Sequence, residues 1–300
     1  MNIFVKTLSS VVLLLVSIAG LAQSASPDDV EELKLAALEA LMAAPPERAL
    51  PIVAKVLAGN NSDEVKEGAL FILSQIDLPE AQALLLDTAR QGRGEISLEA
   101  IRMLGIAGDP DVLAGLVDLY NTGDEDMREA VLEAYLIADD AQSIYQIALN
   151  TDNEDDYQEA VEMLAAMDAR DQLRELRNAR GISASLIEAY AISDDFESLR
   201  ELSLDASDPE LQAQAIEALG IVGGGEVNET LVQIYKNSES PDIREAALDG
   251  LLIADHDEGI LELYRASDDP AEKRELLEYL VWMESEEVWD LIDAAFEDQR

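Results

Sequence analysis

Four arginines stand close together in a chain that is otherwise strongly acidic. They are Arg170, Arg174, Arg177 and Arg180, and they fall within eleven consecutive positions. Offsets of four, three and three residues place all four on one face of a helix. A planar guanidinium group can donate two hydrogen bonds to one carboxylate. This face is therefore a candidate docking site for a carboxylate or an acidic peptide of a partner.

The chain itself offers these arginines a second set of partners. Flanking helices are expected to carry the carboxylates of Glu154, Asp155, Asp156, Glu197 and Glu201. In this interpretation the arginines form internal ion pairs, and we favour it over docking of a partner. The sequence leaves both open.

The composition excludes several kinds of chemistry. The chain has 20 basic and 64 acidic residues and a net charge of −44. A negative electrostatic field repels phosphate, so we expect no nucleic-acid partner. The same field favours a basic protein or peptide as the partner. There is no cysteine and a single histidine, His256, which rules out thiolate sites and clustered-histidine metal sites within one chain.

The remaining candidate motifs lack the context that their chemistry needs. The acidic run 152–156 does not have the spacing of a calcium-binding loop. The glycine-rich segment 220–225 lacks a preceding strand and a following lysine, so it is interpreted as a turn. The aromatic residues Trp282, Trp289 and Phe296 fit either a hydrophobic anchor for a partner or, as we favour, closure of the last repeat's core. We expect no catalytic, cofactor-binding or metal-binding residues.

The first 22 residues have the pattern of a secretory signal. Lys6 is the single charged residue there, and an apolar run follows over residues 11–22. Twelve helical residues span about 18 Å, which is too short to cross a bilayer. Cleavage after Ala22 is predicted, so the protein is expected to be exported, to the periplasm if the source is Gram-negative and otherwise as a secreted protein. No transmembrane span is expected in the mature chain.

One unit repeats through the rest of the chain. Its clearest marker is a column of leucine and tyrosine residues that recurs every 26 to 32 positions: Leu41, Leu73, Leu104, Tyr135, Leu164, Tyr190, Leu219, Leu251 and Leu280. Each unit contains two helical patterns separated by a turn. Prolines 209, 241 and 270 each follow Asp or Ser just before a first helix, which predicts a helix start with that Asp or Ser as the N-cap.

The repeated motifs resemble a known family. Residues 207–225 (SDPELQAQAIEALGIVGGG) and 240–259 (SPDIREAALDGLLIADHDEG) are similar to HEAT repeats, and in particular to the short HEAT-like repeats named after phycocyanobilin lyases. The resemblance covers residues 28–300. It implies an all-α fold, an α-solenoid of about nine stacked helix-turn-helix repeats, and usually a protein-binding scaffold. It does not imply lyase activity.

The expected organisation follows from these patterns. A signal peptide occupies residues 1–22 and one solenoid occupies residues 23–300, with an irregular join near 168–186, where the repeat spacing is shortest, and a C-terminal capping repeat at 268–300. The expected function is a non-catalytic scaffold or adaptor that binds a protein or peptide outside the cytoplasm. The alternatives are a regulatory or assembly subunit of an envelope enzyme or sensor, and, less favoured, an enzyme that uses paired carboxylates. The oligomeric state stays open.

Overall fold

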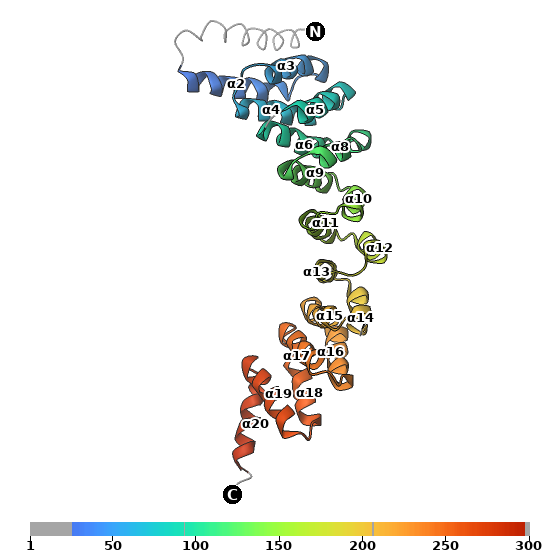
Figure 1. The fold of residues 1–300 in the computed structure, drawn as a ribbon. Coiled ribbons are helices and arrows are strands. Elements are labelled where there is room, and N and C mark those ends of the chain that lie inside the picture. The colour runs from blue at the N-terminus through green and yellow to red at the C-terminus, as the bar shows by residue number, and fades with distance from the viewer. Residues whose placement is uncertain (1–25, 93, 206, 298–300) are drawn as a thin grey trace, which may run out of the picture. The chain divides into compact units, whose positions relative to one another are not determined.

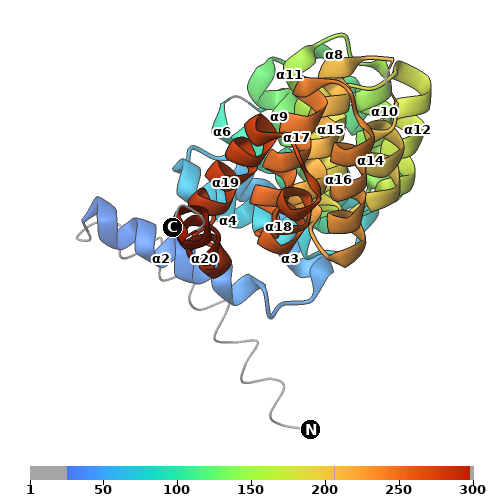
Figure 2. The ribbon, with the colours of Figure 1, turned by 90° about the horizontal axis from the view of Figure 1, so that it is seen from below.

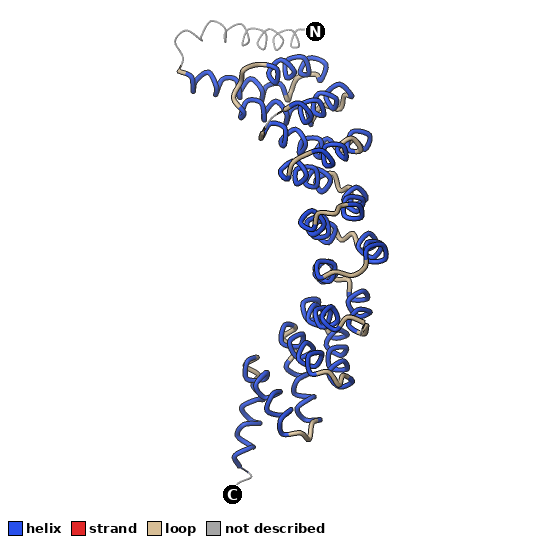
Figure 3. Tube along the Cα trace, viewed as in Figure 1, coloured by secondary structure: helices blue, strands red, loops and turns tan. Residues whose placement is uncertain are grey.

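Paired helices fill the part of the chain that the structure describes. The computed structural model describes residues 26–92, 94–205 and 207–297, with no side-chain description beyond residue 293. No strand occurs in these residues, which confirms the predicted all-α class (Figure 3). The predicted signal segment lies outside them. The chain divides into two compact units, with the boundary between Asp140 and Ala141.

Unit 1 contains two helix pairs, a first helix followed by two short helices, and one further helix. Its helices are α2 (Pro27–Leu41), α3 (Pro46–Ala58), α4 (Asp63–Ser74), α5 (Pro79–Gln91), α6 (Glu95–Ala107), α7 (Pro110–Leu113), α8 (Leu116–Thr122) and α9 (Glu125–Ile137). The first helices of the repeats, α2, α4, α6 and α9, pack against one another in that order. They form one layer of the unit, and the second helices form the other (Figure 1).

Unit 2 repeats the same arrangement. Its helices are α10 (Ala141–Asn150), α11 (Glu154–Ala166), α12 (Arg170–Arg180), α13 (Ala184–Ile192), α14 (Phe196–Ser203), α15 (Pro209–Val222), α16 (Gly225–Asn237), α17 (Pro241–Ile253), α18 (Asp257–Ala266), α19 (Pro270–Trp282) and α20 (Glu286–Glu297). The first helices α11, α13, α15 and α17 pack in sequence. In Figure 2, α15 and α17 lie on one side of this unit and α14 and α16 on the other.

The leucine and tyrosine column forms the centre of the core. All nine of its side chains are buried, which confirms the repeat register. The two tyrosines use their polar ends inside the core: the hydroxyl of Tyr135 donates to the carbonyl of Leu113 at 3.1 Å, and that of Tyr190 to the carbonyl of Leu173 at 3.3 Å. A buried hydroxyl without such an acceptor would cost stability, so these bonds explain how tyrosine replaces leucine here.

The turn between paired helices also has a fixed register. The fourth residue after each column residue has a left-handed backbone from α6 onward: Gly108, Asp139, Asp168, Asp194, Gly223, Asp255 and Glu284. Glycine and aspartate tolerate this conformation better than most residues do. The predicted turn at 220–225 is therefore confirmed by the left-handed Gly223 and Gly224, although aspartate serves the same purpose in more repeats than glycine.

The predicted helix starts are confirmed at the prolines. Pro209, Pro241 and Pro270 are the first residues of α15, α17 and α19. The side chains of Asp208 and Asp269 accept hydrogen bonds from backbone N–H groups of the first turn. Ser240 makes no such bond, so the side-chain cap predicted there is wrong.

Candidate functional site

The four arginines lie on α12, a second helix of unit 2. Leu173 and Leu176 of this helix are fully buried and fix its orientation. Arg170, at its first residue, pairs with Asp168 of the preceding turn at 2.7 Å between Nε and Oδ1. This contact is local and exposed, so it contributes little to the fold.

Arg174 makes the strongest of these contacts. Its Nε and Nη2 atoms lie 2.8 and 2.6 Å from the two carboxylate oxygens of Asp195, the residue that caps α14. The Asp195 side chain is only 1% exposed. Burial acts to raise the pKa of this carboxyl, but the hydrogen bonds from Arg174 and Ser198 outweigh it and hold the pKa below its usual value. Arg174 therefore joins α12 to the start of α14.

Arg177 and Arg180 connect α12 to two further elements. Arg177 pairs with Glu201 of α14 at 3.1 Å. Arg180 donates to the carbonyl oxygens of Ala148 and Thr151, at 2.6 and 2.7 Å, where α10 ends. Its guanidinium also lies 4.4 Å from the ring centroid of Tyr157. A cation at the C-terminal end of a helix is stabilised by the helix dipole and by the free carbonyl groups.

The arginines therefore have internal contacts, but mostly not with the predicted carboxylates: Asp168, Asp195 and two backbone carbonyls serve three of them. Each of the four arginines has an intramolecular partner, and Glu201 is one of the predicted carboxylates. Sequence reasoning missed Asp195, although an Asp before an apolar helical pattern is the signal for an N-cap. Docking of a partner on Arg170, Arg174, Arg177 and Arg180 stays a prediction that these contacts do not test.

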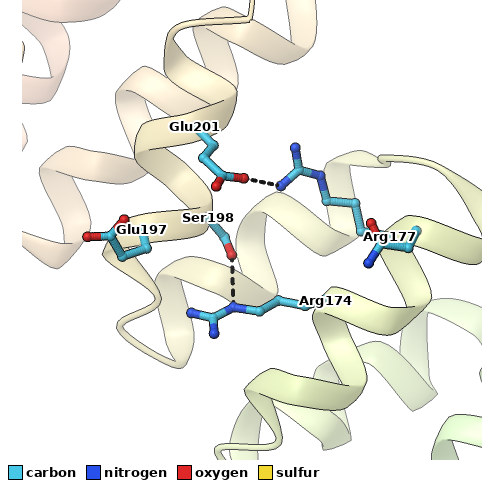
Figure 4. A pocket seen from close by; sticks show the side chains of 6 residues that line it. Arg174, Arg177, Glu197, Ser198 and Glu201 are labelled. Atoms are coloured by element: carbon cyan, nitrogen blue, oxygen red, sulfur yellow. Dashed lines mark hydrogen bonds and ion pairs between the residues drawn. The ribbon is translucent and has the colours of Figure 1, made fainter.

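A surface pocket of about 410 Å³ lies beside this ion-pair group. It is lined by Arg174, Arg177, Asn178, Glu197, Ser198 and Glu201. Figure 4 shows Arg174 next to Ser198 and Arg177 directed at Glu201. The lining contains two guanidinium groups and two carboxylates. Both guanidinium groups are already paired, Arg174 with Asp195 and Arg177 with Glu201. The lining therefore offers no excess charge for an anion.

The two terminal tryptophans do not close the core. Trp282 and Trp289 are 63% and 61% exposed, so the favoured interpretation of these residues was wrong; the side chain of Phe296 lies outside the described part. Trp282 makes an edge contact with the ring of Tyr279, with 5.2 Å between the ring centroids. The core of this repeat is instead filled by Leu276, Leu280 and Val288.

Trp282 belongs to a row of exposed apolar side chains that sequence reasoning did not identify. The residue two positions after the column is large, apolar and more than half exposed in α13, α15, α17 and α19: Ile192, Ile221, Ile253 and Trp282. The residue two positions before the column is acidic in the same helices: Glu188, Glu217, Asp249 and Glu278. We call the first set the apolar ridge and the second the acidic row. The signal was present in the repeat alignment, as an acid followed four residues later by an apolar residue.

The acidic row has few partners within the protein. In the described residues, no basic side chain forms an ion pair with Glu188, Glu217 or Asp249. Asp249 accepts a hydrogen bond from the hydroxyl of Tyr279 at 2.6 Å. Partial burial and the like charges of Asp249 and Glu245 raise the pKa of the Glu217 carboxyl. Within the row, the carboxylates of Glu217 and Asp249 thus repel one another.

No helix of the described residues is long and apolar enough to cross a membrane. No three histidine, cysteine, aspartate or glutamate side chains in that part of the chain are grouped in a way that could hold a metal ion.

Stacked helix pairs around a repeated buried column define a helical-repeat protein of the α-solenoid class. Residues 54–136 match the family model described as HEAT repeats, which confirms the resemblance for this stretch. A search of curated proteins found no match.

Several solved structures match this chain with low TM-scores. Human deoxyhypusine hydroxylase in complex with glycerol is 17% identical, with a TM-score of 0.33 and coverage of 83% of this chain and 99% of that one. The complex of CpcE and CpcF of phycocyanin lyase from Nostoc is 17% identical, with a TM-score of 0.34 and coverage of 80% and 94%. An engineered protein is 16% identical, with a TM-score of 0.28 and coverage of 69% and 96%.

Proposed function

We propose that the protein is a non-catalytic scaffold that binds a protein or peptide partner on its helical layers, outside the cytoplasm. The observation that carries this proposal is the stack of HEAT-type helix pairs, in which each layer presents the same surface positions repeatedly along its length. Repeated exposed positions on a stack suit an extended partner better than a small molecule. The export part of the proposal rests on the signal-like pattern of residues 1–22.

The charge of the chain favours a basic partner. A net charge of −44 attracts cationic surfaces from a distance and raises the rate of association, with a strong dependence on salt. A regulatory or assembly subunit of an envelope enzyme or sensor would use the same surface and differs in the identity of the partner.

Crosslinking in the producing cells, followed by affinity purification and mass spectrometry, tests this function. The expected result is a protein recovered in stoichiometric amount from the extracytoplasmic fraction, with a chain that begins at Gln23. Recovery of no stoichiometric protein, or of a chain that retains residues 1–22 in the cytoplasm, would contradict the proposal.

Variants at the arginines separate docking from internal pairing. Arg170→Gln removes a local exposed contact, whereas Arg174→Gln removes the Asp195 pair. The paired interpretation predicts that Arg174→Gln lowers stability and leaves the captured partner unchanged. Loss of the partner in Arg170→Gln, with unchanged stability, would instead assign the arginine face to docking.

A further inference from the structure

The exposed residues of the apolar ridge occupy the same repeat position in four first helices of unit 2. Ile192, Ile221 and Ile253 are 59%, 65% and 51% exposed, and each stands four residues after an acid of the acidic row. Residues four apart on a helix are neighbours on one face, with about 5–6 Å between their Cβ atoms. Each first helix therefore presents one carboxylate beside one large apolar side chain, in the same register.

The stacking of the helices joins these pairs into a continuous surface. Helix α13 packs against α15, and α15 against α17. The hydrogen bond from Tyr279 to Asp249 extends the contact to α19 and so to Trp282. The first helices α13, α15, α17 and α19 follow one another in Figure 1. Equivalent positions on them therefore place the ridge and the row side by side along the first-helix layer of unit 2.

In unit 1, one position equivalent to the acidic row carries a basic residue that neutralises its neighbours. In α6, the position of the acidic row is taken by Arg102, which pairs with Glu133 of α9 at 2.7 Å and with Glu95 at 3.1 Å. The corresponding positions of unit 2 are all acidic. Unit 2 therefore retains an uncompensated negative charge next to its exposed apolar side chains.

We propose that the apolar ridge and acidic row of unit 2 bind a basic amphipathic helix of a protein partner. Apolar side chains of that helix would cover Ile192, Ile221, Ile253 and Trp282, and its lysines or arginines would pair with the acidic row. Large exposed apolar residues in register mark a binding surface, and an aromatic residue at one end suits an anchor. This inference rests on the proposed scaffold function and names the surface and the chemistry of the partner.

The spacing of the ridge favours a helix over an extended peptide. Packed helices lie about 8–10 Å apart, so the ridge residues recur at about that distance. A partner helix rises about 10.5 Å over seven residues and brings the same face back to the surface after two turns. An extended chain covers a similar distance in three residues, but its side chains alternate between faces, so every second contact would point away.

A synthetic peptide tests the chemistry directly. The probe is a 21-residue helical peptide of alanine and lysine with leucine at every seventh position, and its binding to the full chain is measured by fluorescence anisotropy. Two matched peptides serve as controls: one has leucine at every fifth position, and one has glutamate in place of lysine. We expect binding of the first peptide at least tenfold tighter than of either control. Equal affinity for the two lysine peptides would overturn the helical register.

Two variants locate the binding on the protein. The ridge variant carries Ile192→Ser, Ile221→Ser and Ile253→Ser, and its control carries the substitutions Met42→Ser, Val117→Ser and Leu204→Ser at other exposed apolar positions. The row variant carries Glu188→Gln, Glu217→Gln and Asp249→Asn, and its control carries Glu226→Gln, Glu229→Gln and Glu239→Gln at other exposed acids.

We expect at least a tenfold loss of peptide affinity in the ridge and row variants and less than a twofold loss in their controls. Equal losses in a variant and its control would show attraction by the general field alone and would overturn the proposal. The altered side chains are exposed apart from the half-buried Asp249, whose replacement by Asn keeps an acceptor oxygen for the Tyr279 hydroxyl, so circular dichroism of each variant is expected to match the wild type.

Other occupants of the ridge give different results. If the chain alone sediments as a dimer and the ridge variant as a monomer, the ridge belongs to a second copy and the proposal is wrong. If a peptide of residues 1–22 binds the ridge more tightly than the leucine–lysine peptide, the occupant is the chain's own segment and the proposal is wrong.

If the crosslinked cellular partner is retained by the ridge variant, the scaffold function stands and this inference fails. If no cellular partner exists but the peptide binds as expected, the scaffold function fails instead.

Discussion

In unit 1, Arg102 of α6 holds the register position that Glu217 holds in α15 of unit 2. Arg102 reaches across to Glu133 of the next first helix, and this hydrogen bond raises the pKa of the guanidinium. Glu217 instead faces the like charges of Asp249 and Glu245, and the pKa of its carboxyl is raised by partial burial and by that repulsion. One substitution in a shared repeat thus decides whether neighbouring helices attract or repel one another at the surface.

The four arginines between residues 170 and 180 are placed differently from Arg102. They lie on α12 and pair with α14 and with the end of α10, in the layer of second helices. In unit 2 this positive charge stabilises the second-helix layer, and the first-helix face keeps its carboxylates. The comparison teaches that scarce basic residues in this acidic chain pair across helices, Arg102 within the first-helix layer and Arg174 within the second-helix layer.

The largest expected effect concerns a contact that both units share. A Cβ atom on Gly220 would lie 2.4 Å from the carbonyl oxygen of Gly250, and one on Gly105 would lie 2.5 Å from that of Ala134. Gly220→Ala and Gly105→Ala should each lower the free energy of unfolding by about 2–3 kcal/mol, since close-packed helices must separate. Urea denaturation measures this. Gly225→Ala, where a Cβ meets open space, is the control, and an equal loss there would contradict the close-approach explanation.

The second prediction breaks the arginine joint of unit 2. Asp195→Ala removes both the partner of Arg174 and the cap of α14, and should cost about 2 kcal/mol at pH 7. Because the pKa of Asp195 is lowered in the fold, its contribution is present above the unfolded pKa and is lost as pH falls through the folded pKa. Denaturation at pH 7, 4 and 2 should therefore show the two proteins converging in acid. A difference that does not change with pH would argue against an ionic contribution.

The third prediction removes the neutralising charge of unit 1. Arg102→Gln leaves Glu95, Glu99 and Glu133 without their shared cation, and should lower the free energy of unfolding by about 1 kcal/mol, because these groups are partly exposed. The loss should shrink at high salt, since screening weakens both the attraction and the repulsion. Thermal denaturation at low and high ionic strength measures both effects. The exposed Arg48→Gln is the matched control, for which we expect no change beyond experimental error.

The smallest expected effect has the opposite sign. Glu217→Gln should raise the free energy of unfolding by a few tenths of a kcal/mol at pH 7, because it removes like-charge repulsion. A carboxyl whose pKa is raised in the fold contributes stability at low pH that is lost as pH rises through its titration. The advantage of the variant should therefore vanish below about pH 4. Destabilisation at neutral pH would show that Glu217 has a favourable partner in the fold and would remove the contrast with Arg102.

The sequence alone determined the repeat and its helices. The buried column, the prolines at helix starts and the glycine turn at 220–225 all depend on local preferences and on one period, so they can be read from residue order. Charge balance in an acidic chain also led us to expect internal contacts for the arginines, but of the predicted carboxylates Glu201 is the one shown in such a contact. The signal segment at residues 1–22 rests on sequence alone and stays a prediction.

Only the tertiary structure decided which residues face one another across helices. Asp195 lies 21 positions from Arg174 in the chain and meets it because α12 and α14 belong to one layer. Trp282 and Trp289 suggested a filled core, and their exposure depends on how α19 and α20 pack. The apolar ridge and the acidic row likewise become a surface only when stacking sets equivalent positions side by side. Local sequence preferences determine each helix. Contacts between helices depend on how neighbouring repeats pack, and the sequence of one repeat does not specify this.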